Sequence, residues 1–344
     1  LRSKMIMTSS GLLSVVTFVY GLAAFLYLTS WIFKKETPGS LATWVTVTAM
    51  VGNGAGILLR WVESYRLGIG HAPLANLYES LVFFALMISA IYLVIERRYR
   101  SRVIGAFVLP LAFLAMAYAS LSPNISDRIQ PLIPALKSNW LIAHVLTCFV
   151  GYGAFAVAFG VSLMYLLRKG RTVEGLTAWD FFKAVAVFAS VTLLGRILQL
   201  HSWGGAALIG LGVCFVGYAS AYLYRRLDPA LKQQLLERLP DAKMLDQLNY
   251  QLIMFGFLFL SAGIITGAVW ANSAWGRYWG WDPKETWSLI TWFVYAALLH
   301  ARMMRGWHGR RIAYLSIIGF MAVLFTYFGV NLLPGLHSYG AMGQ

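Results

Sequence analysis

Long apolar segments recur along nearly the whole chain and are separated by short polar connections. A transmembrane helix needs roughly 20 mostly apolar residues. Windows of that kind fall at 11–33, 41–62, 74–95, 103–121, 140–167, 180–199, 205–224, 250–271, 286–303 and 312–331. The pattern predicts an all-α fold, a polytopic membrane helical bundle of about ten transmembrane helices. The first window is too long for a signal peptide and lacks a small-residue cleavage site, so we expect it to be a membrane helix.

Composition supports this class, because 59% of the 344 residues are hydrophobic and only 12% are charged. Such a chain cannot form a soluble globule with a polar surface. The net charge is +15, yet the basic residues gather in alternate connections, as the positive-inside rule requires of an inserted protein. We therefore expect contact with membrane lipid and no nucleic-acid partner. The basic connections that mark the cytoplasmic side are Lys34 and Lys35, Arg97 to Arg102, Arg168 to Arg171, Arg225 and Arg226, 232–243 and 302–311.

This orientation predicts a multi-pass protein of an inner or plasma membrane, or of a thylakoid membrane. Both termini and the connections around His71, 122–139, Ser202 and Trp275 are then periplasmic or outer. Segment 228–247 is charged with leucines at roughly helical spacing, so an amphipathic surface helix and a solvated connector are both open. Cys148 and Cys214 lie inside predicted spans without a CxxC pair, which favours small apolar packing residues over redox thiols.

Six of the thirteen tryptophans crowd between Trp270 and Trp292. Isolated tryptophans such as Trp31 are typical of the aromatic belt at a membrane interface. The density here, with Gly276 and Gly280 interspersed, instead favours a platform for a flat apolar ligand. Asp282, Pro283 and Glu285 have the spacing of a capping box at a helix start. Arg277 and Lys284 are candidates for binding acidic groups of a ligand, although solvent or lipid head groups are alternatives.

The same run resembles the tryptophan-rich WWD signature of membrane haem-handling proteins, and its PKETW continuation resembles the CcsA (ResC) half of system II cytochrome c synthases. Further matches occur in PLANLYESL at 73–81, SNWLIAHV at 138–145 and GVNLLPGLHSYG at 329–340. These matches follow the family's order along most of the chain. The residues that carry the main match are Trp275, Gly276, Tyr278, Trp279, Trp281, Asp282, Pro283, Lys284, Glu285 and Trp287.

Two histidines are expected at the depth of the tryptophan platform. His144 lies one turn inside the outer end of the fifth window, and His337 about as far beyond the last. A lone histidine at a helix end is more commonly just hydrogen-bonded, but the resemblance implies that both are axial ligands of an external haem iron. It also implies that Trp270, Trp275, Tyr278, Trp279, Trp281 and Trp287 bind the macrocycle, and Arg277 and Lys284 its propionates. His144, His337, Trp275, Trp279 and Trp281 would then carry the reaction.

A third histidine belongs to another depth. His300 lies seventeen residues beyond Pro283, which is ~25 Å along a helix at 1.5 Å per residue. The resemblance implies that it ligates haem iron at an inner site, with a second ligand from a CcsB (ResB) membrane subunit. His308 sits in a basic loop and is expected to face solvent, while His71 and His201 are expected in outer loops.

The function that the resemblance implies is delivery of haem b across the membrane and its covalent attachment to Cys-x-x-Cys-His motifs of apocytochrome c. The chain would be a holocytochrome c synthase (haem lyase) subunit, active with CcsB/ResB, and a thioredoxin-like reductant would keep the apocytochrome thiols reduced. We expect one integral-membrane haem-handling domain over 1–344, a periplasmic WWD segment at 270–287, and an extra two-helix insertion with a cytoplasmic connector at 169–249.

Three alternatives remain at this stage. A system I haem-handling subunit would pass haem to a separate chaperone, although the PKETW ending and the GLHSYG tail disfavour it. A multispan transporter would use the platform for a sugar or an aromatic cation without iron. In a structural scaffold the platform would be merely interfacial.

Overall fold

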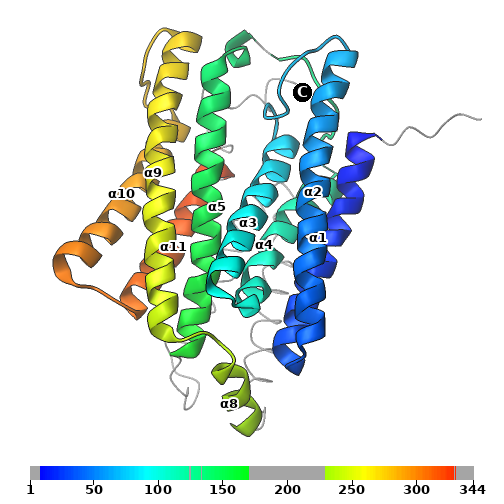
Figure 1. Ribbon diagram of the computed structural model, residues 1–344. Helices are drawn as coiled ribbons and strands as arrows, with labels where there is room; N and C mark the ends of the chain where they lie inside the picture. Colours follow the sequence, from blue (N-terminus) through cyan, green and yellow to red (C-terminus); the bar gives the residue numbers. More distant parts are fainter. Residues whose placement is uncertain (1–7, 124, 133, 170–228, 329, 331–344) are drawn as a thin grey trace, which may run out of the picture.

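The computed structural model describes residues 8–123, 125–132, 134–169, 229–328 and 330. The predicted spans 180–199 and 205–224 lie outside these residues, as do His201, Cys214, His337 and the GLHSYG tail. Most of the predicted insertion at 169–249 lies outside them too. Within the described ranges every regular element is helical (Figure 1). The elements are α1 (Ser9–Phe33), α2 (Glu36–Arg66), α3 (Leu77–Tyr99), η1 (Arg102–Ile104), α4 (Gly105–Leu121), η2 (Pro134–Leu136), α5 (Asn139–Arg168), α8 (Pro229–Glu237), α9 (Ala242–Trp275), α10 (Pro283–Arg305) and α11 (Arg310–Tyr327).

Eight predicted windows fall wholly or largely within the described residues, and each of them overlaps a helix. Seven of these helices are long and apolar enough to cross a membrane. The exception is α10, whose apolar run is diluted by serine, threonine, tryptophan and His300. The all-α polytopic membrane fold is thereby confirmed, and the crossing by α10 stays a prediction.

Segment 228–247 is resolved into two helices instead of one. α8 ends at Glu237, and α9 begins at Ala242. Pro240 separates them, because proline cannot continue the hydrogen-bond ladder of the preceding helix. Asp241 then caps α9 by accepting a hydrogen bond from the backbone N–H of Lys243 at 3.1 Å.

The contact between α5 and α9 forms the middle of the bundle, with α3 and α11 also packed on α5. Small residues let the two backbones approach closely, as is common between membrane helices. A Cβ added at Gly151 of α5 would lie 2.9 Å from the carbonyl oxygen of Gly256, and one added at Gly263 would lie 2.5 Å from Cys148 Sγ. Cys148 is buried in this contact, in line with its predicted packing role.

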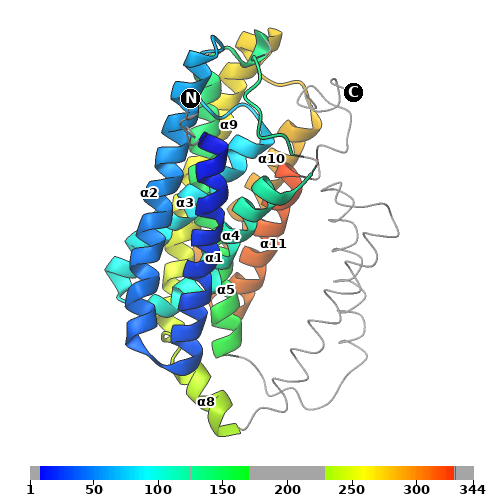
Figure 2. The ribbon, with the colours of Figure 1, turned by 90° about the vertical axis from the view of Figure 1, so that its right-hand side faces the viewer.

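The bundle has two chemically different ends, and Figures 1 and 2 show which connections lie at each. At one end, called the basic end below, lie α8 and the connections between α1 and α2, α3 and α4, and α10 and α11. At the opposite end, called the tryptophan end, lie residues 276–282 between α9 and α10 and the connection between α4 and α5. The alternation of basic and non-basic connections that the sequence predicts is therefore an arrangement in space.

Candidate functional site

His144 lies near the tryptophan end of α5, and its ring is fixed by α9. Ring atom Nδ1 is 2.7 Å from the carbonyl oxygen of Gly263. A carbonyl oxygen only accepts, so Nδ1 carries the hydrogen, and in the neutral ring the lone pair lies on Nε2. Nε2 forms no hydrogen bond with any described residue. In metal sites a ligating imidazole is commonly held in this way, with its other nitrogen bonded to a carbonyl.

Two glycines of α9 make this position possible. Gly263 supplies the acceptor carbonyl and lets α5 approach. The backbone of Gly267, one turn further along α9, lies directly against the imidazole. A Cβ added at this position would be 2.6 Å from His144 Nδ1. Any larger residue at 267 would have to displace the ring.

Tryptophan continues the aromatic surface beside the histidine. The Trp270 ring is nearly parallel to that of His144, with centroids 6.1 Å apart and 11° between planes. Trp275 meets Trp270 edge-on at 4.8 Å. Trp270 is only 2% exposed, so it supports the surface from behind while Trp275 extends it towards the loop.

The loop after α9 presents the remaining platform residues more openly. α9 ends at Trp275 and is capped by Gly276, whose φ of +72° is the left-handed conformation that favours glycine. Trp279 and Trp281 form an edge-to-face pair at 5.8 Å. Trp281 and Tyr278 are 70% and 60% exposed. Exposure on this scale leaves two aromatic side chains available to a large ligand.

The predicted capping box is confirmed. The Asp282 side chain accepts from the backbone N–H of Lys284 at 3.1 Å, and the Glu285 carboxylate accepts from those of Asp282 at 3.1 Å and Gly280 at 2.8 Å. The acidic members of the signature therefore shape the loop and start α10. Of the two candidate cations, Arg277 is exposed and lies against Gly280, and Lys284 is half-buried in the first turn of α10.

The six tryptophans do not form one cluster. Trp287 packs against Phe325 of α11, with ring centroids 4.1 Å apart. Trp292 lies deeper, and its indole N–H donates to Ser261 Oγ at 2.8 Å. The structure thus joins Trp270 and Trp275 to His144 and leaves Trp279 and Trp281 as a pair in the loop.

His300 lies in a different setting. α10 is continuous from Pro283, so His300 is ~25 Å along it. Its side chain is exposed on the same helix face as Ile290, Phe293, Ala297 and Met304, at spacings of three and four residues. No hydrogen bond to His300 occurs among the described residues.

The connection between α4 and α5 leads into His144 and is held by its own backbone carbonyls. Arg60 Nη1 donates to the carbonyl of Asp127 at 2.7 Å. His71 Nε2 is 3.0 Å from that of Gln130. The Trp270 indole N–H donates to that of Ala135 at 2.9 Å. Three side chains from three parts of the chain therefore fix this connection.

Sequence reasoning missed the central member of this group. Arg60 is 2% exposed and pairs with buried Glu79, with Nε 2.7 Å from Oε1. An arginine within a predicted membrane span is costly unless paired, which is the signal that could have found it. The Glu79 carboxylate is engaged by this pair and also accepts from the backbone N–H of Ala75 at 2.8 Å. The other ring nitrogen of His71, Nδ1, is 2.9 Å from the carbonyl oxygen of Ala72. Both ring nitrogens therefore face carbonyls, and His71 has a structural role.

Taken together, fold and site define a polytopic α-helical membrane protein with a histidine and tryptophan surface at one end. The chain belongs to the family of cytochrome c assembly proteins, which matches residues 74–337. Among its relatives are cytochrome c biogenesis proteins CcsA of Gloeobacter violaceus (40% identical over 336 residues, 95% of this chain and 93% of the relative), Synechococcus elongatus (42% over 287 residues, 82% and 81%) and Synechocystis (38% over 317 residues, 90% and 89%).

These comparisons confirm the resemblance stated from sequence. This is a CcsA-type cytochrome c biogenesis protein, a multi-pass membrane protein with a role in haem handling. Apocytochrome c is the substrate that this role implies.

Proposed function

We propose that the chain passes haem b across the membrane and attaches it to apocytochrome c, as the haem lyase subunit of a complex with a CcsB/ResB-type partner. The observation that carries the proposal is the hydrogen bond from His144 Nδ1 to Gly263 beside the parallel ring of Trp270. It leaves Nε2 for iron and fixes the ring plane without help from a ligand.

The donors at the tryptophan end fit haem. His144 would supply one axial nitrogen, and His337 the second from outside the described residues. Trp275, Trp279 and Trp281 would cover the macrocycle, flanked by Tyr278, and Trp270 would hold the ligand histidine. Arg277 and Lys284 would pair with the propionates, since cations bind carboxylates by charge-assisted hydrogen bonds. The segment 270–287 is the periplasmic WWD segment of this proposal.

The chemistry needs positioning more than acid–base groups. Each apocytochrome thiol adds across one vinyl group: a sulfur–carbon bond forms, and the thiol hydrogen goes to the other vinyl carbon. The incoming histidine of Cys-x-x-Cys-His would replace one axial ligand. This addition involves no net oxidation or reduction, so the thiols must already be reduced, which is the task of a thioredoxin-like partner. Cys148 is buried behind His144 and has no part in it.

The inner site would use His300 and a histidine of the partner. Its exposure on α10 supports this assignment, because a ligand shared between two subunits has to face outwards. The basic end would be cytoplasmic, and haem would move from His300 towards His144.

Absorption spectra of the purified chain test the proposal. We expect a bis-histidine haem spectrum after haem-replete expression, lost in His144→Ala or His337→Ala and restored in both by added imidazole. His308→Ala is the matched control, because that histidine is exposed and bonds only its own loop at the carbonyl of Gly306. Unchanged spectra in both variants would refute the ligand assignment. Absence of haem, alone and with the partner, would favour the non-haem transporter.

A further inference from the structure

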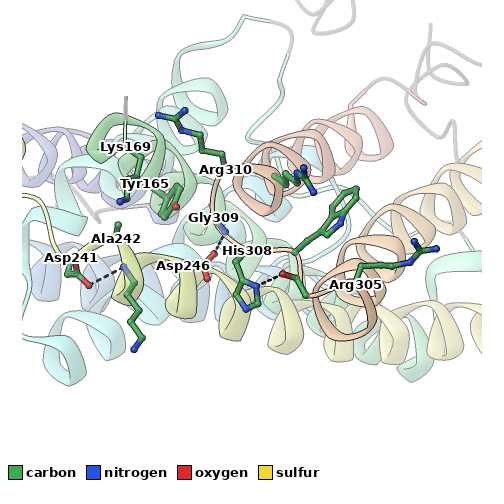
Figure 3. A pocket seen from close by; sticks show the side chains of 13 residues that line it. Tyr165, Lys169, Asp241, Ala242, Asp246, Arg305, His308, Gly309 and Arg310 are labelled. Carbon is green, nitrogen blue, oxygen red and sulfur yellow. Dashed lines mark hydrogen bonds between the residues drawn. The ribbon is translucent and has the colours of Figure 1, made fainter. Parts of the chain in front are cut away.

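We propose that the basic end contains a binding site for the head group of an anionic phospholipid. A hollow of about 900 Å³ opens there, between the last residues of α5, the start of α9 and the turn from α10 into α11 (Figure 3). This volume lies within the range of small-molecule sites. The histidines and tryptophans assigned to haem lie elsewhere, so the site is additional to the proposed function.

The hollow carries an excess of positive charge. Lys169, Lys243, Arg305, Arg310 and Arg311 line it. Only two carboxylates accompany them, Asp241 and Asp246. A surface of this sign attracts phosphate groups.

Both carboxylates are already engaged. Asp241 caps α9 through the backbone N–H of Lys243. Asp246 accepts from the backbone N–H of Gly309 at 2.8 Å and from Arg302 Nη1 at 2.9 Å, and it thereby fixes the turn between α10 and α11. The two acids build the walls of the hollow and do not pair with its lining cations.

One wall presents three hydrogen-bond donors. Lys169, Tyr165 and Arg310 all line the hollow, whereas the Arg305 side chain extends away from these three in Figure 3. Within the described ranges of the chain, none of these three forms a side-chain hydrogen bond or ion pair. An ammonium, a guanidinium and a phenol hydroxyl at one place suit the oxygens of a phosphodiester.

The position of the hollow favours a lipid over a soluble phosphate. It lies where three candidate membrane spans, α5, α9 and α11, reach their basic ends, which is the level of lipid phosphates. Tyr314, Ile318 and Met321 continue from Arg311 along one face of α11, and all three are exposed. Acyl chains would cover this face while the head group occupies the hollow.

The test measures binding of phosphatidylglycerol to the delipidated full chain in detergent, by native mass spectrometry. We expect the double variant Lys169→Gln with Arg310→Gln to bind it about 10-fold more weakly or worse, and Tyr165→Phe to bind it more weakly than wild type. Arg97→Gln with Arg98→Gln is the matched control: it removes the same charge at the same end, from exposed residues outside the hollow. We expect the control to change binding less than twofold.

Three results would overturn the proposal. Equal losses of phosphatidylglycerol binding in the two double variants would mean that overall surface charge, and not the hollow, binds the lipid. Glycerol 3-phosphate competing at the same concentration as the lipid would make this a soluble-phosphate site. Equal binding of phosphatidylcholine would remove the selectivity for anionic lipid. Haem spectra of the same samples separate this outcome from the proposed function, because His144 and His300 are untouched.

Discussion

The two described histidines that are candidates for binding iron have opposite surroundings. His144 has its Nδ1 bonded to Gly263, its ring against Gly267 and its face along Trp270. His300 stands exposed on α10, without a hydrogen bond from any described residue. The first ring is held in one orientation before any ligand arrives, and the second is not.

This difference shows which part of the molecule fixes the orientation of each histidine before a ligand binds. Holding a ligand residue in its productive geometry lowers the cost of binding. At the tryptophan end the chain supplies that hold itself, through α9 and the fixed connection between α4 and α5. At His300 the hold has to come from another surface, as the proposed partner would provide.

We expect the largest effect from a substitution of Arg60, which holds the connection between α4 and α5. Arg60→Met leaves Glu79 charged and buried without its partner, so the free energy of unfolding should fall by about 3–5 kcal/mol. Thermal unfolding in detergent measures it. The double variant Arg60→Met with Glu79→Leu should recover most of the loss, because both buried charges are then gone. A single-variant loss below about 1 kcal/mol would mean that the pair does not anchor this end.

Gly267→Ala changes the orientation of the His144 ring directly. Its Cβ would press on Nδ1 from 2.6 Å and turn the ring away from Gly263, so haem affinity at the tryptophan end should fall about 10- to 100-fold, as for other supports of a metal ligand. Haem titration of the apoprotein measures it. Gly54→Ala is the matched control, since a Cβ there would meet no atom within 4 Å. Equal affinities for the two variants would contradict a fixed His144.

Trp270→Phe should have a smaller effect, on the connection between α4 and α5. It keeps an aromatic face beside His144 but removes the indole donor to the carbonyl of Ala135, at a cost of about 0.5–1.5 kcal/mol. Hydrogen exchange should increase in 134–138 in particular. Trp61→Phe provides the comparison, because Trp61 is exposed on α2. If both variants exchange alike, the indole bond does not hold the connection.

His300→Ala should have the smallest effect on the chain alone. His300 is exposed and has no hydrogen-bond partner among the described residues, and such a side chain contributes within about ±0.5 kcal/mol. The free energy of unfolding and the spectrum of the tryptophan-end haem should therefore not change. Co-expression with the CcsB/ResB-type partner should then reveal the loss of a second haem signal. A large destabilisation of the isolated chain would show that His300 is held after all.

Hydropathy predicted the helices well, because membrane insertion imposes a length and an apolarity that can be read locally. The start of α10 was also readable, since Asp282, Pro283 and Glu285 form a capping box within one turn. Segment 228–247 was harder, because Pro240 breaks a pattern whose leucines otherwise suit one helix.

The contacts around the site could not be predicted from local sequence patterns. Arg60 meets Asp127 and Glu79, and Trp270 meets Ala135, across separations that only the packed bundle closes. The tryptophans looked like one platform in sequence, yet Trp287 packs on α11 and Trp292 on α9. Adjacency along the chain does not decide which rings share a surface.

Arg60, His71 and Trp270 hold the connection between α4 and α5 through its main-chain oxygens. Every residue type carries that oxygen, so replacing Asp127, Gln130 or Ala135 leaves all three acceptors in place. The outward side chains of this connection are therefore free to diversify while its path past His144 stays constant. The surface beside His144 can therefore be altered at this connection without rebuilding the bundle.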